Sequence, residues 1–358
     1  MYEATGVLIK GFTITPSLTN GSRNAGIVVG WLCTNCTITD CVIEGFNATE
    51  SCCPAGIDME GTGCKIFRNV LRYNFHAIST ESSLENGDHQ IYKNVITDND
   101  FGVYGYTPDK LMCNFKAVWG NNITENGYGI AVLNSTNNII YHNNFINNTW
   151  SYQPTYGEVQ IWDNGYPSGG NYWDKYVGVD ADHDCLGDTS YNVYSNNKDN
   201  YPLMGPFHTF NAGTWNETQF DTDIVSKSGI AGFDFNPDSK TLNFVVMGRD
   251  DTTGFCRVTI PKDIMWCDNL GEWTITVGGT LIAPTNVTQT IKYTYICFVY
   301  THSTKVVEIK STNAVPEFAV VPILLMLVMA TTLVAVVTNR KHTLRATNRS
   351  YSAHRRRN

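Results

Sequence analysis

Four aspartates with regular spacing carry the clearest chemistry of this chain. They lie in one short segment: Asp180, Asp182, Asp184 and Asp188. Alternate residues of a tightly turned loop direct their oxygen atoms toward one point, where Leu186 can add its backbone carbonyl. A hard cation such as Ca²⁺ takes six to eight oxygen ligands of this kind. The spacing predicts a calcium site, with a solvated acidic turn as the alternative. Cys185 stands where calcium loops usually place glycine.

The elements that must position this loop are indicated by a repeat in the first half of the chain. A six-residue motif returns every 22–28 residues, as Asn69–Asn74, Asn94–Asn99, Asn121–Asn126 and Asn143–Asn148, with a degraded copy that begins at Cys41. A fixed period of this length is typical of a solenoid. Short Ile, Val and Phe runs broken by Asn and Gly indicate strands and turns rather than helices. We predict a right-handed parallel β-helix over residues 1–162.

Vertical stacking of equivalent residues explains the composition of this repeat. Successive rungs of such a coil lie about 4.8 Å apart. Asn tolerates left-handed backbone at the corners, and its amide can bond to the copy on the next rung. The same register places Cys36 above or below Cys64. An apolar side chain lies three residues before each anchor, which predicts an inward column: Ile38, Ile66, Ile91, Val118 and Ile140.

Eleven cysteines suit a location outside the cytosol, and their odd number leaves at least one outside any internal pair. Six of them crowd the early rungs: Cys33, Cys36, Cys41, Cys52, Cys53 and Cys64. Cys33 and Cys36 form a CxxC pair without a second pair at ligand spacing. Disulfides or packed thiols are therefore favoured over zinc.

Aromatic and Gly-rich stretches follow the repeats, at Ile161–Gly165 and Gly169–Tyr176. The end of a solenoid exposes unpaired edges and an open core, so another part of the chain must cover it. We predict that residues 163–207 form an aromatic cap that includes the Asp-rich loop. Stacking of sugars on Trp and Tyr faces is the alternative for these rings.

Residues 208–312 change to separate alternating strands. A small antiparallel β-sandwich of immunoglobulin-like size is expected from strands at this spacing. The runs that indicate it are 241–246, 255–260, 272–277, 291–299 and 306–309.

The end of the chain predicts a membrane anchor. Residues 318–337 hold no charged side chain, and 20 residues are about the length needed to cross a bilayer as a helix. A basic tail follows over residues 338–358, which places that end in the cytoplasm and the bulk of the chain outside. The first residues lack a basic start and an apolar signal segment. We therefore expect the chain to begin inside the solenoid, with earlier rungs missing.

The formal net charge of −8 argues against a nucleic-acid partner, because binding to phosphates needs a basic face. An outside location would also suit N-glycosylation, for which the chain has eight acceptor motifs before residue 318. They are Asn20, Asn35, Asn47, Asn122, Asn134, Asn147, Asn216 and Asn286.

Three runs of residues carry a resemblance to a known family. They are 170–174, 180–188 and 199–204, which together resemble the closing module of NosD-like parallel β-helix proteins of archaea. The motif Val315-Pro316-Glu317-Phe318 resembles the PEF-type sorting tail of archaeal surface proteins. That likeness implies an archaeosortase as a partner. The copper-related role of the NosD family is not supported here by a clustered Met/His set, since His76, His89 and His142 fall in separate repeats.

These observations predict a membrane-anchored cell-surface β-helix protein with a structural or carbohydrate-binding role. Its partners would be membrane lipid and an envelope polysaccharide or glycoprotein, with Ca²⁺ as cofactor. One alternative is a polysaccharide lyase or glycoside hydrolase on the β-helix flank, where Asp98 and Asp100 form the nearest pair and Glu125 or Asp88 could join across rungs. A NosD-like copper accessory protein is the other alternative.

Overall fold

The structure is a computed structural model that describes residues 3–16, 25–47, 53–81, 87–106, 115–154 and 158–315. The predicted transmembrane helix, the basic tail, Cys52 and the acceptor Asn20 lie outside these residues. Within the described ranges, which stop at residue 315, no helix has the length and apolar character needed to cross a membrane.

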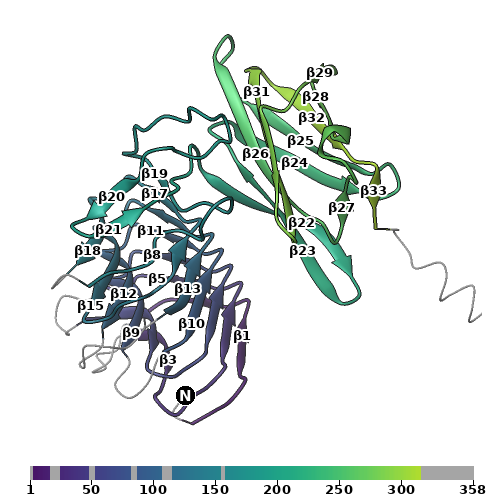
Figure 1. The fold of residues 1–358 in the computed structure, drawn as a ribbon. Helices are drawn as coiled ribbons and strands as arrows, with labels where there is room; N and C mark the ends of the chain where they lie inside the picture. Colours follow the sequence, from purple (N-terminus) through teal and green to yellow (C-terminus); the bar gives the residue numbers. More distant parts are fainter. Residues whose placement is uncertain are drawn as a thin grey trace, which may run out of the picture.

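The first half of the chain forms a parallel β-helix, as predicted (Figure 1). Short strands of successive rungs pair in parallel in three sheets. The first sheet contains β1 (Leu8–Lys10), β4 (Thr37–Thr39), β7 (Lys65–Phe67), β10 (His89–Tyr92), β13 (Phe115–Trp119) and β16 (Ile140–Tyr141). The second contains β2 (Thr13–Ile14), β5 (Val42–Glu44), β8 (Val70–Arg72), β11 (Val95–Thr97), β14 (Asn122–Thr124), β17 (Asn144–Ile146) and β19 (Tyr172–Trp173). The third contains β3 (Ala25–Val29), β6 (Ala55–Met59), β9 (His76–Glu81), β12 (Phe101–Tyr106), β15 (Tyr128–Leu133) and β18 (Trp150–Pro154).

The observed register confirms the predicted stacking. Ile66 pairs with Ile38 below and Ile91 above, and Val118 continues the column to Ile140. All five side chains are buried in one apolar core. Thr37 pairs with Lys65, so the preceding Cys36 and Cys64 also stack, as predicted. Cys33, Cys36, Cys41 and Cys64 are buried free thiols, which favours packing over disulfides for these four.

Asparagine ladders hold the corners together. In the first ladder Asn69, Asn94, Asn121, Asn143 and Asn171 each accept, through the side-chain oxygen, a hydrogen bond from the backbone N–H one rung below. A second ladder runs through Asn74, Asn99, Asn126 and Asn148 in the same way. These amides are buried, and a buried polar group without a partner is costly. The ladders therefore explain why the repeat keeps asparagine.

The predicted left-handed asparagines at the corners are found only in part. Asn35 and Asn147 take this backbone, but the ladder asparagines do not, and in most rungs it belongs to the residue before the ladder asparagine. Arg68, Lys93 and His142 have φ near +55° ahead of the first ladder, as do Tyr73 and Asp98 ahead of the second. The asparagine that follows can then point its amide inward, toward the copy on the next rung.

The cap closes the β-helix with side chains that end these ladders. The predicted boundary at residue 162 falls too early, because β19 adds a strand to the second sheet by pairing with β17. Trp162 and Trp173 are each 1% exposed and complete the apolar core. Their indole N–H groups donate to Asn197 and Asp199 on β21 (Asn197–Asp199), which pairs with β20 (Tyr191–Tyr194). Asp199 also accepts from the N–H of Asn171 and so terminates the first ladder.

The second half forms two antiparallel five-stranded sheets that share one apolar core, as predicted for the sandwich. One sheet contains β22 (Phe207–Trp215), β23 (Thr218–Val225), β26 (Thr253–Pro261), β31 (Tyr293–Thr301) and β30 (Asn286–Gln289). The other contains β24 (Gly229–Asn236), β25 (Thr241–Met247), β32 (Lys305–Lys310), β28 (Thr274–Val277) and β29 (Thr280–Ile282). A small sheet, β27 (Met265–Trp266) with β33 (Asn313–Ala314), and the 3-10 turn η1 (Leu270–Glu272) complete it.

Candidate functional site

The Asp-rich loop lies at the joint between the cap and the sandwich. Cys185 forms a disulfide with Cys297 of β31, with a Cα–Cα distance of 6.0 Å. The hydroxyl of Thr285 donates to the carbonyl of His183 at 3.0 Å. Cys185 has a φ of +68°, so it takes the backbone conformation that glycine would supply in a calcium loop. Cys185 departs from the calcium pattern because it links two parts of the chain.

Three of the predicted calcium ligands converge. Carboxylate oxygens of Asp180, Asp182 and Asp188 lie within 4.8 Å of one another, a spacing that fits oxygen ligands around a calcium ion. Asp184 points elsewhere, since its carboxylate is buried and accepts from the N–H of Leu186 at 2.8 Å. Leu186 packs in the apolar cluster at the joint and bridges to Leu203.

Electrostatics within this loop oppose uncompensated charge. Burial raises the pKa of Asp180, and the neighbouring charges of Asp184 and Asp182 add to this rise. Backbone N–H groups of Asp184 and Cys185 donate to Asp180 and offset part of it. Burial likewise raises the pKa of Asp184. A cation at Asp180, Asp182 and Asp188 would compensate this charge.

A buried arginine fastens the cap to the sandwich. Arg257 on β26 donates from Nε to the carbonyl of Asp184 at 3.1 Å and from Nη2 to the carbonyl of Pro167. Its guanidinium carbon lies 4.6 Å from the ring centroid of Tyr295. Because an arginine side chain pairs well with several acceptors in a fixed plane, these contacts fix the angle between cap and sandwich.

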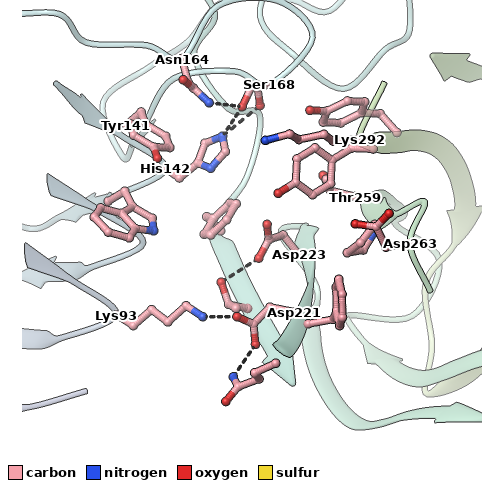
Figure 2. A pocket seen from close by; sticks show the side chains of 18 of the residues that line it. Lys93, Tyr141, His142, Asn164, Ser168, Asp221, Asp223, Thr259, Asp263 and Lys292 are labelled. Atoms are coloured by element: carbon pink, nitrogen blue, oxygen red, sulfur yellow. Dashed lines mark hydrogen bonds and ion pairs between the residues drawn. The ribbon is translucent and has the colours of Figure 1, made fainter. Parts of the chain in front are cut away.

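A cleft opens beside this joint, between the β-helix flank and the sandwich. Its volume is about 390 Å³, within the range of about 300–1,000 Å³ that is usual for small-ligand pockets. Figure 2 shows Tyr141 and His142 of the β-helix facing Asp221, Asp223 and Lys292 of the sandwich. Further side chains of the wall are Lys93, Trp119, Asn164, Ser168, Thr209, Asp263, Tyr293 and Tyr295.

Pairs of polar contacts hold the two walls of the cleft in place. Lys93 Nζ lies 2.6 Å from Asp221 Oδ2 across the mouth. Asn144 donates to the carbonyl of Phe207 at 2.9 Å and accepts from its N–H at 2.7 Å. The ring of Phe207 stacks on His142 with a centroid distance of 4.5 Å. The cleft is therefore framed by contacts between elements remote in sequence.

The titratable groups of the cleft have contrasting environments. Burial raises the pKa of Asp223 to about 6, although the hydrogen bond from Thr209 at 2.8 Å acts to lower this pKa. Burial lowers the pKa of His142 to about 4, so this ring is neutral at pH 7, where its Nε2 contacts the carbonyl of Ser168 at 2.9 Å. Burial raises the pKa of Tyr141 to about 12. The cleft thus combines hydroxyl, carboxyl, amine and ring groups that suit a polar ligand.

Aromatic rings form a column that leads into the cleft. Phe67, Tyr92, Trp119 and Tyr141 stack on successive rungs with centroid distances of 4.8, 4.2 and 6.3 Å. Because these rings cover one another, their faces are largely occupied. Tyr293 differs, as it is 38% exposed on the opposite wall. It is the ring best placed in the cleft to stack on a ligand.

The other candidates from the sequence lie outside the cleft. Asp98 and Asp100 are exposed on either side of the buried Asn99, and Glu125 occupies the corner that follows Asp98 on the next rung. Asp88 is an exposed corner residue with a φ of +50°. None of these four lines the cleft.

The three histidines lie in three separate surroundings. The ring of His76 stacks on Tyr104 with a centroid distance of 4.3 Å. His89 accepts from the N–H of Cys64 at 3.4 Å, and His142 lies in the cleft. Burial lowers the pKa of His76 and His89 to about 4, as it does for His142. Each ring is therefore neutral at pH 7.

Comparison with a protein-family model agrees with the architecture of the first half of the chain. The model of a family described as periplasmic copper-binding protein (NosD) matches residues 4–178. This stretch covers the β-helix and the beginning of the cap, so this part of the chain is a NosD-like parallel β-helix. No curated protein matches the sequence. A similar solved structure is a mutant tailspike protein of E. coli bacteriophage HK620 in complex with a pentasaccharide. It is 10% identical with a TM-score of 0.30, and the match covers 86% of this chain and 70% of that one.

Proposed function

We propose that this chain is a membrane-anchored surface protein that binds carbohydrate in the cleft between its β-helix and its sandwich. The observation that carries the proposal is the composition of the cleft. An accessible tyrosine ring, Tyr293, stands among side chains that donate or accept hydrogen bonds. Sugars present both an apolar ring face and many hydroxyl groups, so they fit a wall of this kind.

Lys292 and Asp223 define how a sugar would be oriented. The side chain of Lys292 extends into the cleft toward His142 and Ser168 (Figure 2). Asp223 also lines the cleft, where it accepts from Thr209 with one carboxyl oxygen. Lys292 would bond a hydroxyl or carboxylate of the sugar, and Asp223 another hydroxyl. Tyr293, which lines the same cleft, would cover the ring face.

The location outside the cytosol has separate support. The disulfide between Cys185 and Cys297 suits an oxidising compartment. The acceptor residues Asn35, Asn147 and Asn216 are exposed, as N-glycosylation would require. Residues 318–337 supply the proposed anchor, which an archaeosortase would process if the tail acts as a sorting signal.

Protease added to intact cells should digest the chain while an epitope at residue 358 stays protected; digestion of that epitope would contradict the topology.

Calcium at the Asp-rich loop is a further part of the proposal. Asp180, Asp182 and Asp188 would hold the ion. Because the same loop carries Cys185, bound calcium would stiffen the joint beside the cleft. A copper-accessory role would instead require soft ligands brought together, and metal titration of the full chain separates the two metals.

The binding test uses the full chain in detergent micelles on an array of neutral and acidic glycans, followed by calorimetry. Tyr293→Ala should weaken the tightest glycan at least ten-fold, about 1.4 kcal/mol, through loss of the stacking ring. Tyr194→Ala is the matched control, because Tyr194 is 53% exposed on β20 and does not line the cleft. Equal affinities of these two variants, or no bound glycan, would refute the proposal.

A further inference from the structure

Two carboxylates reach into the cleft from one strand. Asp221 and Asp223 are separated by a single residue on β23, and alternate side chains of a strand point to opposite faces. Thr222 between them is fully buried on the other face. Two residues of an antiparallel strand rise about 6.8 Å. A backbone rise of this size can place two carboxyl groups about 6.5–9.5 Å apart, which is the separation in an inverting glycoside hydrolase.

The two carboxylates have different partners. Asp221 forms the ion pair with Lys93 at 2.6 Å and also accepts from Gln219 at 3.0 Å. Asp223 has a neutral partner, the hydroxyl of Thr209 at 2.8 Å. Lys93 therefore places its positive charge against the carboxyl group of Asp221. The enclosed position of Asp223 favours the protonated acid.

We propose that the cleft hydrolyses a glycosidic bond of the bound carbohydrate with inversion, with Asp223 as the general acid and Asp221 as the general base. This inference rests on the proposed carbohydrate binding. Asp223 gives its proton to the leaving oxygen as the bond from that oxygen to the anomeric carbon breaks. A water molecule forms the new bond to this carbon and gives a proton to Asp221. Both carboxyl groups regain their starting states by proton exchange with solvent.

The surroundings of the pair agree with these roles. Burial raises the pKa of Asp223 to about 6, and the charge of Asp221 adds to the rise. A carboxylic acid with a raised pKa is the usual proton donor of such a pair. The neighbouring charged and titratable groups are Lys93, His142, Asp263 and Lys292, together with the phenols of Tyr141, Tyr293 and Tyr295.

The test measures reducing ends released from the glycan that binds tightest, with the full chain in detergent. Asp223→Asn and Asp221→Asn should each lower the rate at least 100-fold, which is the lower range for loss of a general acid or base. Both variants should still bind the glycan within about ten-fold of the original chain. Asp238→Asn is the control, because Asp238 is an exposed turn residue of the sandwich outside the cleft. NMR of the first product should show the inverted anomer.

The outcomes separate the two proposals. A glycan that binds in a Tyr293-dependent manner without release of reducing ends would overturn hydrolysis and leave binding intact. No bound glycan would overturn both. Product with retained configuration, or full activity of Asp223→Asn, would overturn the assigned roles.

Discussion

The interior of the β-helix and the cleft differ in the partners of their polar side chains. Inside the β-helix, Asn121 bonds Asn94 and Asn143, its equivalents 27 and 22 residues away. The exposed flank follows the same rule, since Asp40 pairs with Arg68 on the next rung at 2.7 Å, and the hydrogen bond from that guanidinium lowers the pKa of Asp40 to about 2. In the cleft, Lys93 instead pairs with Asp221, which lies 128 residues away in the sandwich and outside the repeat.

This difference indicates where a repeat protein keeps polar groups available to bind a ligand. Repetition gives each polar group a partner at the equivalent position of the next rung, so it satisfies hydrogen bonds and leaves few groups for a ligand. The cleft forms where the sandwich packs against the flank of the repeat. Its side chains therefore lack a partner of their own kind, and Tyr293, Lys292 and Asp223 remain directed at a common space.

The largest effect should follow from breaking a ladder. Asn121→Ala removes the acceptor of two donors on Asn94 and the donor to Ile91 and Asn143. Several buried groups then lose their partners, and we expect a loss of about 4 kcal/mol in the free energy of unfolding. Urea denaturation measures it. Asn192→Ala is the control, since Asn192 is exposed on β20; equal losses for the two variants would contradict the structural role of the ladder.

Removal of the link between the two regions should have the next largest effect. The double variant Cys185→Ser and Cys297→Ser opens a cross-link of 112 residues. Disulfides typically stabilise by about 2–4 kcal/mol, so we expect a loss of about 3 kcal/mol. Thermal unfolding under oxidising conditions measures it. The β-helix ladders should keep their stability in this variant, and concerted loss of both regions would show that they are not separate units.

The pH dependence of the cap provides a third comparison. Burial raises the pKa of Asp199 to about 7 in the folded chain, against its usual 3.8. Between pH 4 and pH 7 the unfolded chain has therefore lost a proton that the folded chain retains. The contribution of Asp199 to stability therefore falls as pH rises through this window and is constant above it. The stability difference between the original chain and Asp199→Asn should show this decline; parallel pH curves would contradict it.

Calcium should produce the smallest effect. At ten times its dissociation constant, Ca²⁺ should add about 1.4 kcal/mol to the stability of the full chain, because it binds the folded loop. Asp182→Ala should abolish this gain, whereas Asp250→Ala, at an exposed turn of the sandwich, should retain it. Calorimetry without a binding signal, or an unchanged signal in Asp182→Ala, would exclude the site.

The sequence predicts the repetitive region well because each rung repeats the same inward apolar position and the same ladder asparagine. The column from Ile38 to Ile140 and the partners of Asn69 follow from one period. The strands over β25, β26, β31 and β32 are also found from alternation alone. The strands β22 and β23 are missed, because their Asn, Gly and Thr residues weaken the apolar pattern.

The cleft depends on those missed strands. Asp221 and Asp223 lie on β23, and their partners Lys93 and Thr209 come from a β-helix corner and from β22. No spacing in the sequence relates them, because tertiary packing alone brings them together. The alternation of Asp221 and Asp223 around Thr222 is the local signal in the sequence for two carboxylates on one face of a strand. The sequence predicts the Asp-rich loop because its carboxylates are local, whereas the link to Cys297 joins residues 112 positions apart and has no local signal.

Carbohydrate binding in the cleft is tested most directly by a crystal structure of the full chain with the glycan that binds it most tightly. We expect a sugar ring stacked on Tyr293, with polar groups within hydrogen-bond distance of Lys292 and Asp223. A glycan located elsewhere, such as over the exposed Trp150 of β18, with the cleft free of sugar, would contradict it.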